Sequence, residues 1–126
     1  MRILLSFRCH RCSIRDAIPA HFLLHINTLK RARGLLGQRE VPAGEGVVLL
    51  PCDSIHCLGM SCTIDVVYVH VDDWPGLSGV VILCETVRPW KIGTNPAGTS
   101  MVIELARGAG EAAGLAPGTR VRLLRP

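Results

Sequence analysis

A carboxylate set among valines is the residue of this sequence whose chemistry is most sharply defined. Asp65 falls within 64–71, where apolar side chains alternate onto both faces of an extended chain. Burying an ionised carboxylate without a partner is costly, so we expect Asp65 to be buried and charge-paired. Its candidate partners are Arg33, Arg88 and His56, together with backbone amides at the neighbouring turns. Such a pair could fix the register of a sheet, or it could belong to a ligand-binding or catalytic site.

Sulfur and imidazole groups are concentrated just before that strand. Cys52, Cys57 and Cys62 recur every five residues, with His56 inside the set and Met60 beside it. Structural zinc sites pair their ligands two to four residues apart, so the spacing does not match a zinc knuckle. Small buried cysteines are common in hydrophobic cores, and we expect these thiols to be reduced and metal-free.

The first residues contain two half-sites of a zinc finger. Cys9 and Cys12 have the spacing of one ligand pair, and His21 and His25 that of the other, but only eight residues separate the pairs, where about twelve are usual. We therefore expect no metal and no cofactor here. A zinc clip on these four residues is the alternative, and it would order the segment that carries them.

Two cations and an indole follow one another at the end of an expected strand. In the run Arg88-Pro89-Trp90-Lys91, Trp90 can cover the core while Arg88 points to Asp65. The same two side chains, placed at the mouth of a curled sheet, could instead hold an anionic or aromatic ligand.

Short apolar runs at intervals of about ten residues indicate the elements that position these groups. The expected strands are 47–50, 64–71, 79–85, 101–105 and 120–124, with turn residues between them. The second and third should form an antiparallel hairpin around Asp72-Asp73-Trp74-Pro75-Gly76. Helical spacing and capping residues predict one helix from Asn27 or Thr28 to Leu36 and another over 108–114. The sequence thus predicts an α+β fold with a curled or barrel-like, mostly antiparallel sheet and two short helices.

Composition limits the class of protein. The chain has 126 residues, 48% of them hydrophobic and 19% charged, which fits a single globular domain. We expect residues 23–126 to form it and residues 1–22 to be a flexible extension. The opening apolar stretch, 3–7, is too short for a secretory leader, and no run could span a membrane, so we expect a cytoplasmic protein with reduced thiols and no membrane partner.

The net charge of +4 is unevenly distributed. Residues 1–40 carry eight Arg or Lys and two acidic residues, a balance of +6, and the remainder carries −2. A polyanion would therefore bind through the first third of the chain.

Five short motifs, taken in order, resemble the bacterial and archaeal family called domain of unknown function 192. They are the run 31–37 (RARGLLG), the segment 50–60 with Leu-Pro-Cys, Ile-His and Gly-Met, the triplet 64–66 (IDV), the run 88–91 (RPWK), and Val-Ile-Glu-Leu at 102–105 leading to 114–118 (GLAPG). The resemblance covers about residues 29–125. It implies a compact α+β domain with a curled sheet and no established activity. Thr63 stands where the family usually has a proline, and His56 where many members have an aromatic residue.

These observations favour a non-enzymatic ligand-binding or accessory domain that takes a small molecule or a protein partner. Its pocket would be lined by His56, Met60, Asp65, Arg88 and Trp90, with Arg33 nearby. One alternative is a small hydrolase-like or metal-dependent enzyme in which His56 is the base and Asp65 orients it. The other is a nucleic-acid accessory protein that acts through residues 1–40.

Overall fold

A hairpin of two ten-residue strands dominates the fold. In a computed structural model, which describes residues 2–8, 23–26, 41–42, 44–55 and 60–124, β4 (Ile64–Asp73) pairs antiparallel with β5 (Ser78–Val87). Both strands are rich in valine and isoleucine, whose branched side chains suit a pleated surface. The hairpin predicted from the sequence is confirmed.

A bulge in β5 shifts the pairing of this hairpin by one residue. Tyr68 faces Leu83 and the next residue, Val69, faces Val81, which leaves Ile82 without a residue directly opposite. Because side chains alternate between the two faces of a strand, such an insertion exchanges the faces of all residues on one side of it.

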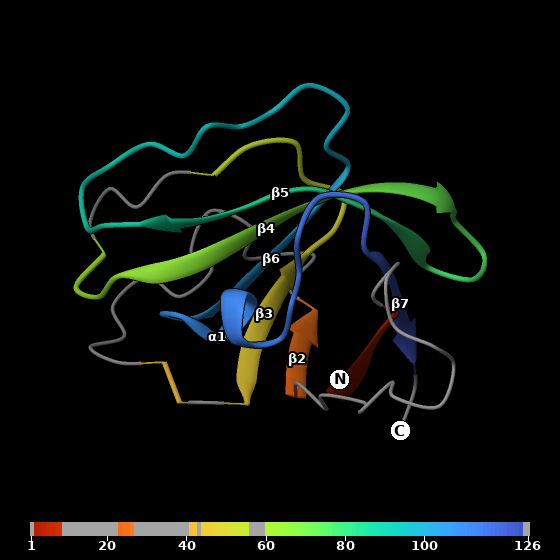
Figure 1. The fold of residues 1–126 in the computed structure, drawn as a ribbon, viewed down its shortest axis with the longest axis horizontal. Coiled ribbons are helices and arrows are strands. Elements are labelled where there is room, and N and C mark those ends of the chain that lie inside the picture. The colour runs from red at the N-terminus through yellow and green to blue at the C-terminus, as the bar shows by residue number, and fades with distance from the viewer. Residues whose placement is uncertain (1, 9–22, 27–40, 43, 56–59, 125–126) are drawn as a thin grey trace.

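The remaining strands close the sheet into a barrel (Figure 1). They are β1 (Arg2–Arg8), β2 (Leu23–Ile26), β3 (Glu45–Leu49), β6 (Met101–Ala106) and β7 (Arg120–Leu124). The order around the barrel is β1-β2-β3-β6-β4-β5-β7, and β1 pairs with β7 to complete it. All pairs are antiparallel except β2 with β3. A four-residue helix, α1 (Ala109–Ala112), follows β6.

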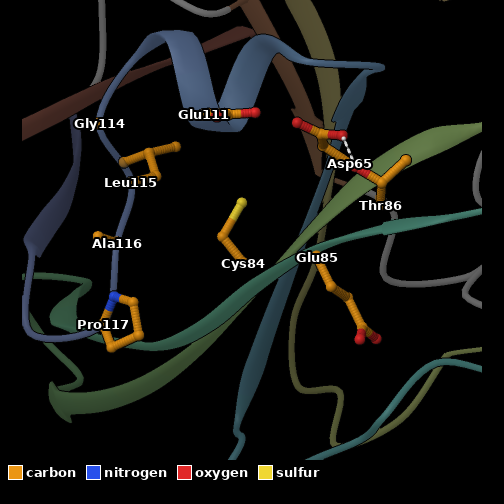
Figure 2. A pocket seen from close by; sticks show the side chains of 9 residues that line it. All are labelled: Asp65, Cys84, Glu85, Thr86, Glu111, Gly114, Leu115, Ala116 and Pro117. Carbon is orange, nitrogen blue, oxygen red and sulfur yellow. Dashed lines mark hydrogen bonds between the residues drawn. The ribbon is translucent and has the colours of Figure 1, made fainter.

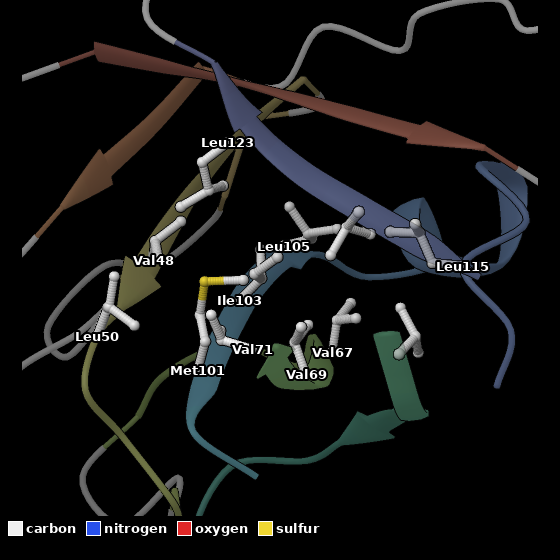
Figure 3. Packing of buried hydrophobic residues seen from close by; sticks show 12 residues of the cluster. Val48, Leu50, Val67, Val69, Val71, Met101, Ile103, Leu105, Leu115 and Leu123 are labelled. Carbon is white, nitrogen blue, oxygen red and sulfur yellow. The ribbon is translucent and has the colours of Figure 1, made fainter. Parts of the chain in front are cut away.

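Two apolar clusters lie on opposite sides of the sheet. Val67 and Val69 of β4 contribute to an inner cluster with Met101, Ile103 and other residues of the barrel interior (Figure 3). Val66 and Tyr68, on the opposite face of the same strand, belong to an outer cluster. The strand is therefore buried on both faces at its centre, as its sequence predicts.

The described part of the chain departs from the expected elements in two places. The strands at 101–105 and 120–124 and the second helix are found, but the described residues contain one helix instead of two, and the fold is mostly β. The expected first helix, from Asn27 or Thr28 to Leu36, lies outside those residues. Within the expected extension, Arg2–Arg8 form a barrel strand, because a run of seven residues is long enough for a strand.

No helix among the described residues has the length and apolar character needed to cross a bilayer.

Candidate functional site

Asp65 is a buried carboxylate on the inner face of the barrel, and hydrogen bonds fix its orientation. It is 2% exposed and shares the inner face of β4 with Val67 and Val69. One carboxylate oxygen accepts a hydrogen bond from the Thr86 hydroxyl at 2.9 Å, and the other accepts one from the Gly110 amide at 3.0 Å. Both donors thus hold the carboxylate in a single orientation.

Of the cations expected to pair with Asp65, the structure describes Arg88 alone, and Arg88 does not pair with it. Arg88 is exposed, and no described cation forms a salt bridge with Asp65, while Arg33 and His56 lie outside the described residues. Among the described residues, the partners of the carboxylate are a backbone amide and a hydroxyl, and pairing with Arg33 or His56 stays a prediction.

The start of α1 is fitted closely against this carboxylate. A Cβ atom built on Gly110 would lie 2.5 Å from the Cys84 sulfur and 3.2 Å from an Asp65 oxygen. Only a residue without a side chain lets the backbone amide come this near to Asp65. Gly108, at the N-cap of α1, has φ 80°, a left-handed conformation that glycine adopts without strain.

The bulge at Ile82 decides which side chains of β5 face Asp65. Thr86 lies directly opposite Asp65, and Cys84 opposite Val67, so both share the inner face. Glu85 is directed to the outer face. If the register of the pairs Val71–Gly79 and Val69–Val81 continued without the bulge, Glu85 would be opposite Asp65 and the two carboxylates would repel one another.

Between the helix and β5 there is a pocket of about 280 Å³ (Figure 2). Asp65 and Glu111 contribute carboxylates at the helix side, and the Cys84 thiol projects from β5 toward the helix. Leu115 provides an apolar wall, which is continued by the segment 116–117. Although Glu85 also borders the pocket, its carboxylate points away from it.

The pocket thiol is held in its protonated form. Burial, reinforced by the negative charges of Asp65, Glu111 and Glu85, raises the pKa of Cys84 to about 11. Burial and the nearby Glu104 also raise the pKa of the Cys62 thiol. Cys52, Cys62 and Cys84 are free thiols, and the expectation of reduced cysteines elsewhere in the chain stays a prediction.

Glu85 anchors a separate hydrogen-bond network on the outer face. Its carboxylate accepts hydrogen bonds from the Tyr68 hydroxyl at 2.7 Å, the Thr94 amide at 2.7 Å and the Thr94 hydroxyl at 2.5 Å. Burial by itself raises the pKa of Glu85, but the hydrogen bonds from Thr94 and Tyr68 outweigh it, and the pKa of Glu85 is lowered.

Of the predicted site residues that the structure describes, Asp65 alone lines the pocket beneath α1. Met60 is buried in the outer cluster, across the sheet from Asp65. Arg88 and Trp90 are exposed on the loop after β5 and do not line the pocket.

The side chains of the other predicted site residues are not described by the structure. His56, Arg33, Cys9, Cys12 and His21 lie outside the described residues. For His25 only the backbone is described, as part of β2. The zinc alternative therefore stays a prediction. Within the ranges that are described, no group of three His, Cys, Asp or Glu side chains could hold a metal ion.

Sequence reasoning missed most of the pocket wall. Thr86, Cys84, Gly110, Glu111 and Leu115 surround Asp65, yet none belongs to a motif with chemical meaning. The one usable signal is the hairpin, which places β5 beside Asp65. Its register shifts by one residue at Asp72 and shifts back at Ile82, so a count from the pair Asp73–Ser78 reaches Thr86 opposite Asp65 only because the two shifts cancel.

The family comparison matches most of the chain. A family model described as DUF192, Uncharacterized ACR, matches residues 23–123. No curated protein matches the sequence.

Two solved structures share the fold. The first, titled a protein of unknown function from Novosphingobium aromaticivorans, has a TM-score of 0.69 and 20% identity over 95% of this chain and 84% of its own. The second, titled a putative transcription regulator from Sinorhizobium meliloti, has a TM-score of 0.72 and 15% identity over 98% of this chain and 94% of its own. At such identities the likeness extends to the fold alone.

Proposed function

The chain belongs to the uncharacterised DUF192 family, and we propose that it is a non-enzymatic binding domain whose pocket beneath α1 takes a small cationic ligand. The observation that carries this proposal is the orientation of Asp65. Its two oxygens are fixed by Thr86 and Gly110, but a carboxylate has about four acceptor sites. Asp65 can therefore accept further hydrogen bonds from a ligand in the pocket.

The residues that line the pocket suit a ligand with one positively charged end and a short apolar part. Asp65 and Glu111 place two carboxylates near the helix, whereas Leu115 and Pro117 offer apolar surface. A volume of about 280 Å³ lies at the lower end of ligand sites, which span about 300–1,000 Å³. We infer that a small primary ammonium compound matches the size and charge of the site.

The state of Cys84 supports binding over thiol catalysis. A cysteine nucleophile reacts as its thiolate, and catalytic cysteines have lowered pKa values. The pKa of Cys84 is instead raised to about 11, so nearly all molecules carry the neutral thiol at pH 7. A neutral thiol serves as a weakly polar lining group.

A titration with butylamine tests the proposal. Amide resonances of Asp65, Gly110 and Leu115 should shift with butylamine and stay unchanged with butanol, which has the same chain without the charge. Glu111→Gln should weaken butylamine binding several-fold without changing the thermal midpoint, because Glu111 is exposed. Asp53→Asn, which removes an exposed carboxylate outside this pocket, is the matched control. Equal shifts with butanol and butylamine would contradict the ligand class, and an unchanged Glu111→Gln affinity would contradict the site.

No described contact favours the two alternative functions. The enzyme would need His56, and the nucleic-acid protein would act through residues 1–40, whose side chains are not described. The name of the Sinorhizobium structure makes the second alternative worth testing. Binding of a random-sequence DNA duplex that weakens steeply with salt and is lost in Arg31→Glu/Arg33→Glu would support it.

A further inference from the structure

A tryptophan occupies the glycine position of a turn on the loop after β5. The Lys91 amide donates to the Arg88 carbonyl at 3.3 Å, which closes a four-residue turn with Pro89 second and Trp90 third. Trp90 has φ 65°. Turns that have proline as the second residue and a positive φ at the third residue favour glycine or asparagine at the third position. Other residues strain the backbone when they adopt this φ. Trp90 therefore lowers the stability of its own turn.

Burial of the Trp90 side chain does not offset the energy cost of this strained backbone conformation. Trp90 is 68% exposed, and Ile92, two residues on, is 70% exposed. A tryptophan that contributed to folding would lie in the core, where its large apolar surface has its greatest effect. Here a strained backbone presents it to solvent, which points to a role in recognition.

The loop is fixed at its base, so its tip is presented in one arrangement. Glu85 binds the amide and hydroxyl of Thr94. The side chain of Asn95 bonds to both the amide and the carbonyl of Ile55, at 2.8 and 3.2 Å. A surface fixed before binding loses little conformational entropy when a partner docks.

Charge indicates the kind of partner. Arg88 and Lys91 flank Trp90, both are exposed, and neither forms a salt bridge with a described residue. No Asp or Glu occurs between 86 and 103, and Glu85 is already engaged by Thr94 and Tyr68. The two cations thus lack a carboxylate partner within the described structure.

We propose that Arg88, Trp90, Lys91 and Ile92 form a docking surface for an acidic segment of a partner protein that also carries apolar side chains. Tryptophan and arginine are the residues that most often dominate protein interfaces, and paired charges around them set specificity and association rate. This surface shares no residue with the pocket beneath α1 and does not depend on a ligand there.

A random peptide library displayed on phage tests the proposal while the natural partner is unidentified. The wild-type protein is the target, and Trp90→Gly is the counter-target. Glycine relieves the strain at the third turn position, so this variant should melt at the wild-type temperature or above it while losing the recovered peptides. We expect these peptides to combine Asp or Glu with Leu, Phe or Trp, and to bind Trp90→Gly at least ten-fold more weakly.

Two further variants separate charge from apolar contact. Lys91→Glu should weaken the recovered peptides several-fold, and a rise in salt should weaken wild-type binding. Trp74→Gly is the matched control, since Trp74 is 49% exposed but follows Asp72 and Asp73, and it should bind the peptides as the wild type does. The proposal is overturned if no peptide distinguishes the wild type from Trp90→Gly, if the recovered peptides lack acidic residues, or if a random-sequence oligonucleotide binds in their place with the same Trp90 dependence.

Discussion

Replacing Asp65 by alanine should release α1 from the barrel wall and destabilise the protein. The change removes the acceptor of the Gly110 amide and that of the Thr86 hydroxyl. Gly110 is buried, so its N–H would be left without a partner, whereas Thr86 is exposed and its hydroxyl can turn to water. The two losses are therefore unequal.

The magnitude follows from these two bonds. A buried hydrogen bond to a charged group contributes about 1.5–3 kcal/mol, and the rehydrated hydroxyl adds about 0.5 kcal/mol. We expect Asp65→Ala to lower the free energy of unfolding by about 2–4 kcal/mol. At this chain length that corresponds to a fall in the thermal midpoint of roughly 10 °C.

Asp65→Asn is the matched control. Its amide oxygen can still accept from Gly110, and its NH₂ group can donate to Thr86, whose hydroxyl both donates and accepts. The cost should be about 1 kcal/mol. Urea unfolding gives both values, and hydrogen exchange at the Gly110 amide should accelerate strongly in the alanine variant only. Equal destabilisation by Ala and Asn, or unchanged exchange at Gly110, would refute the assigned role of Asp65.

Three other outcomes follow from the sites described. Alkylation of Cys84 by iodoacetamide should be slow at pH 7 and should accelerate as the pH approaches about 11; rapid labelling at pH 7 would contradict the raised pKa. The pKa of Glu85 is lowered in the folded protein, so the charged carboxylate should stabilise the fold fully above its unfolded pKa of about 4.3, and this stabilisation should be lost as the pH falls through the folded pKa. The difference in free energy of unfolding between the wild type and Glu85→Gln should therefore narrow over that pH range. A difference independent of pH would contradict the lowered pKa. Gly93→Ala would bring its Cβ to 2.1 Å from the Tyr68 hydroxyl oxygen and should cost about 1–3 kcal/mol; Tyr68→Phe should relieve part of this cost, and strictly additive effects would contradict the clash.

The sequence predicts β4 and the burial of Asp65 because both depend on local pattern. Valines alternate on both sides of Asp65, and a strand with two apolar faces must be covered on both. The strand Arg120–Leu124 and the hairpin are likewise predicted from apolar runs bounded by turn residues. The burial of a side chain follows from its neighbours in the chain.

The partners of Asp65 could not be predicted in the same way. Gly110 is 45 residues away and contributes a backbone amide, a donor that almost every residue possesses. Thr86 faces Asp65 because the register shift at Ile82 of β5 cancels the shift at Asp72 of β4, and no residue type marks either position. Residue types suggest a cation as the partner, but they do not indicate which backbone amide or hydroxyl the tertiary fold brings to Asp65.

The pairing of β1 with β7 has a consequence for how the chain folds during synthesis. Leu5 lies opposite Leu123, so two barrel strands that are more than a hundred residues apart in the chain are paired, and β1 is synthesised well before β7. Contacts between such distant parts of a chain form slowly because a long loop must close first. The edge of β1 that will receive β7 stays unpaired until residue 124 has left the ribosome, and unpaired strand edges recruit other chains. Translation rate and chaperone binding should therefore influence the yield of this protein more than that of a helical protein of equal length.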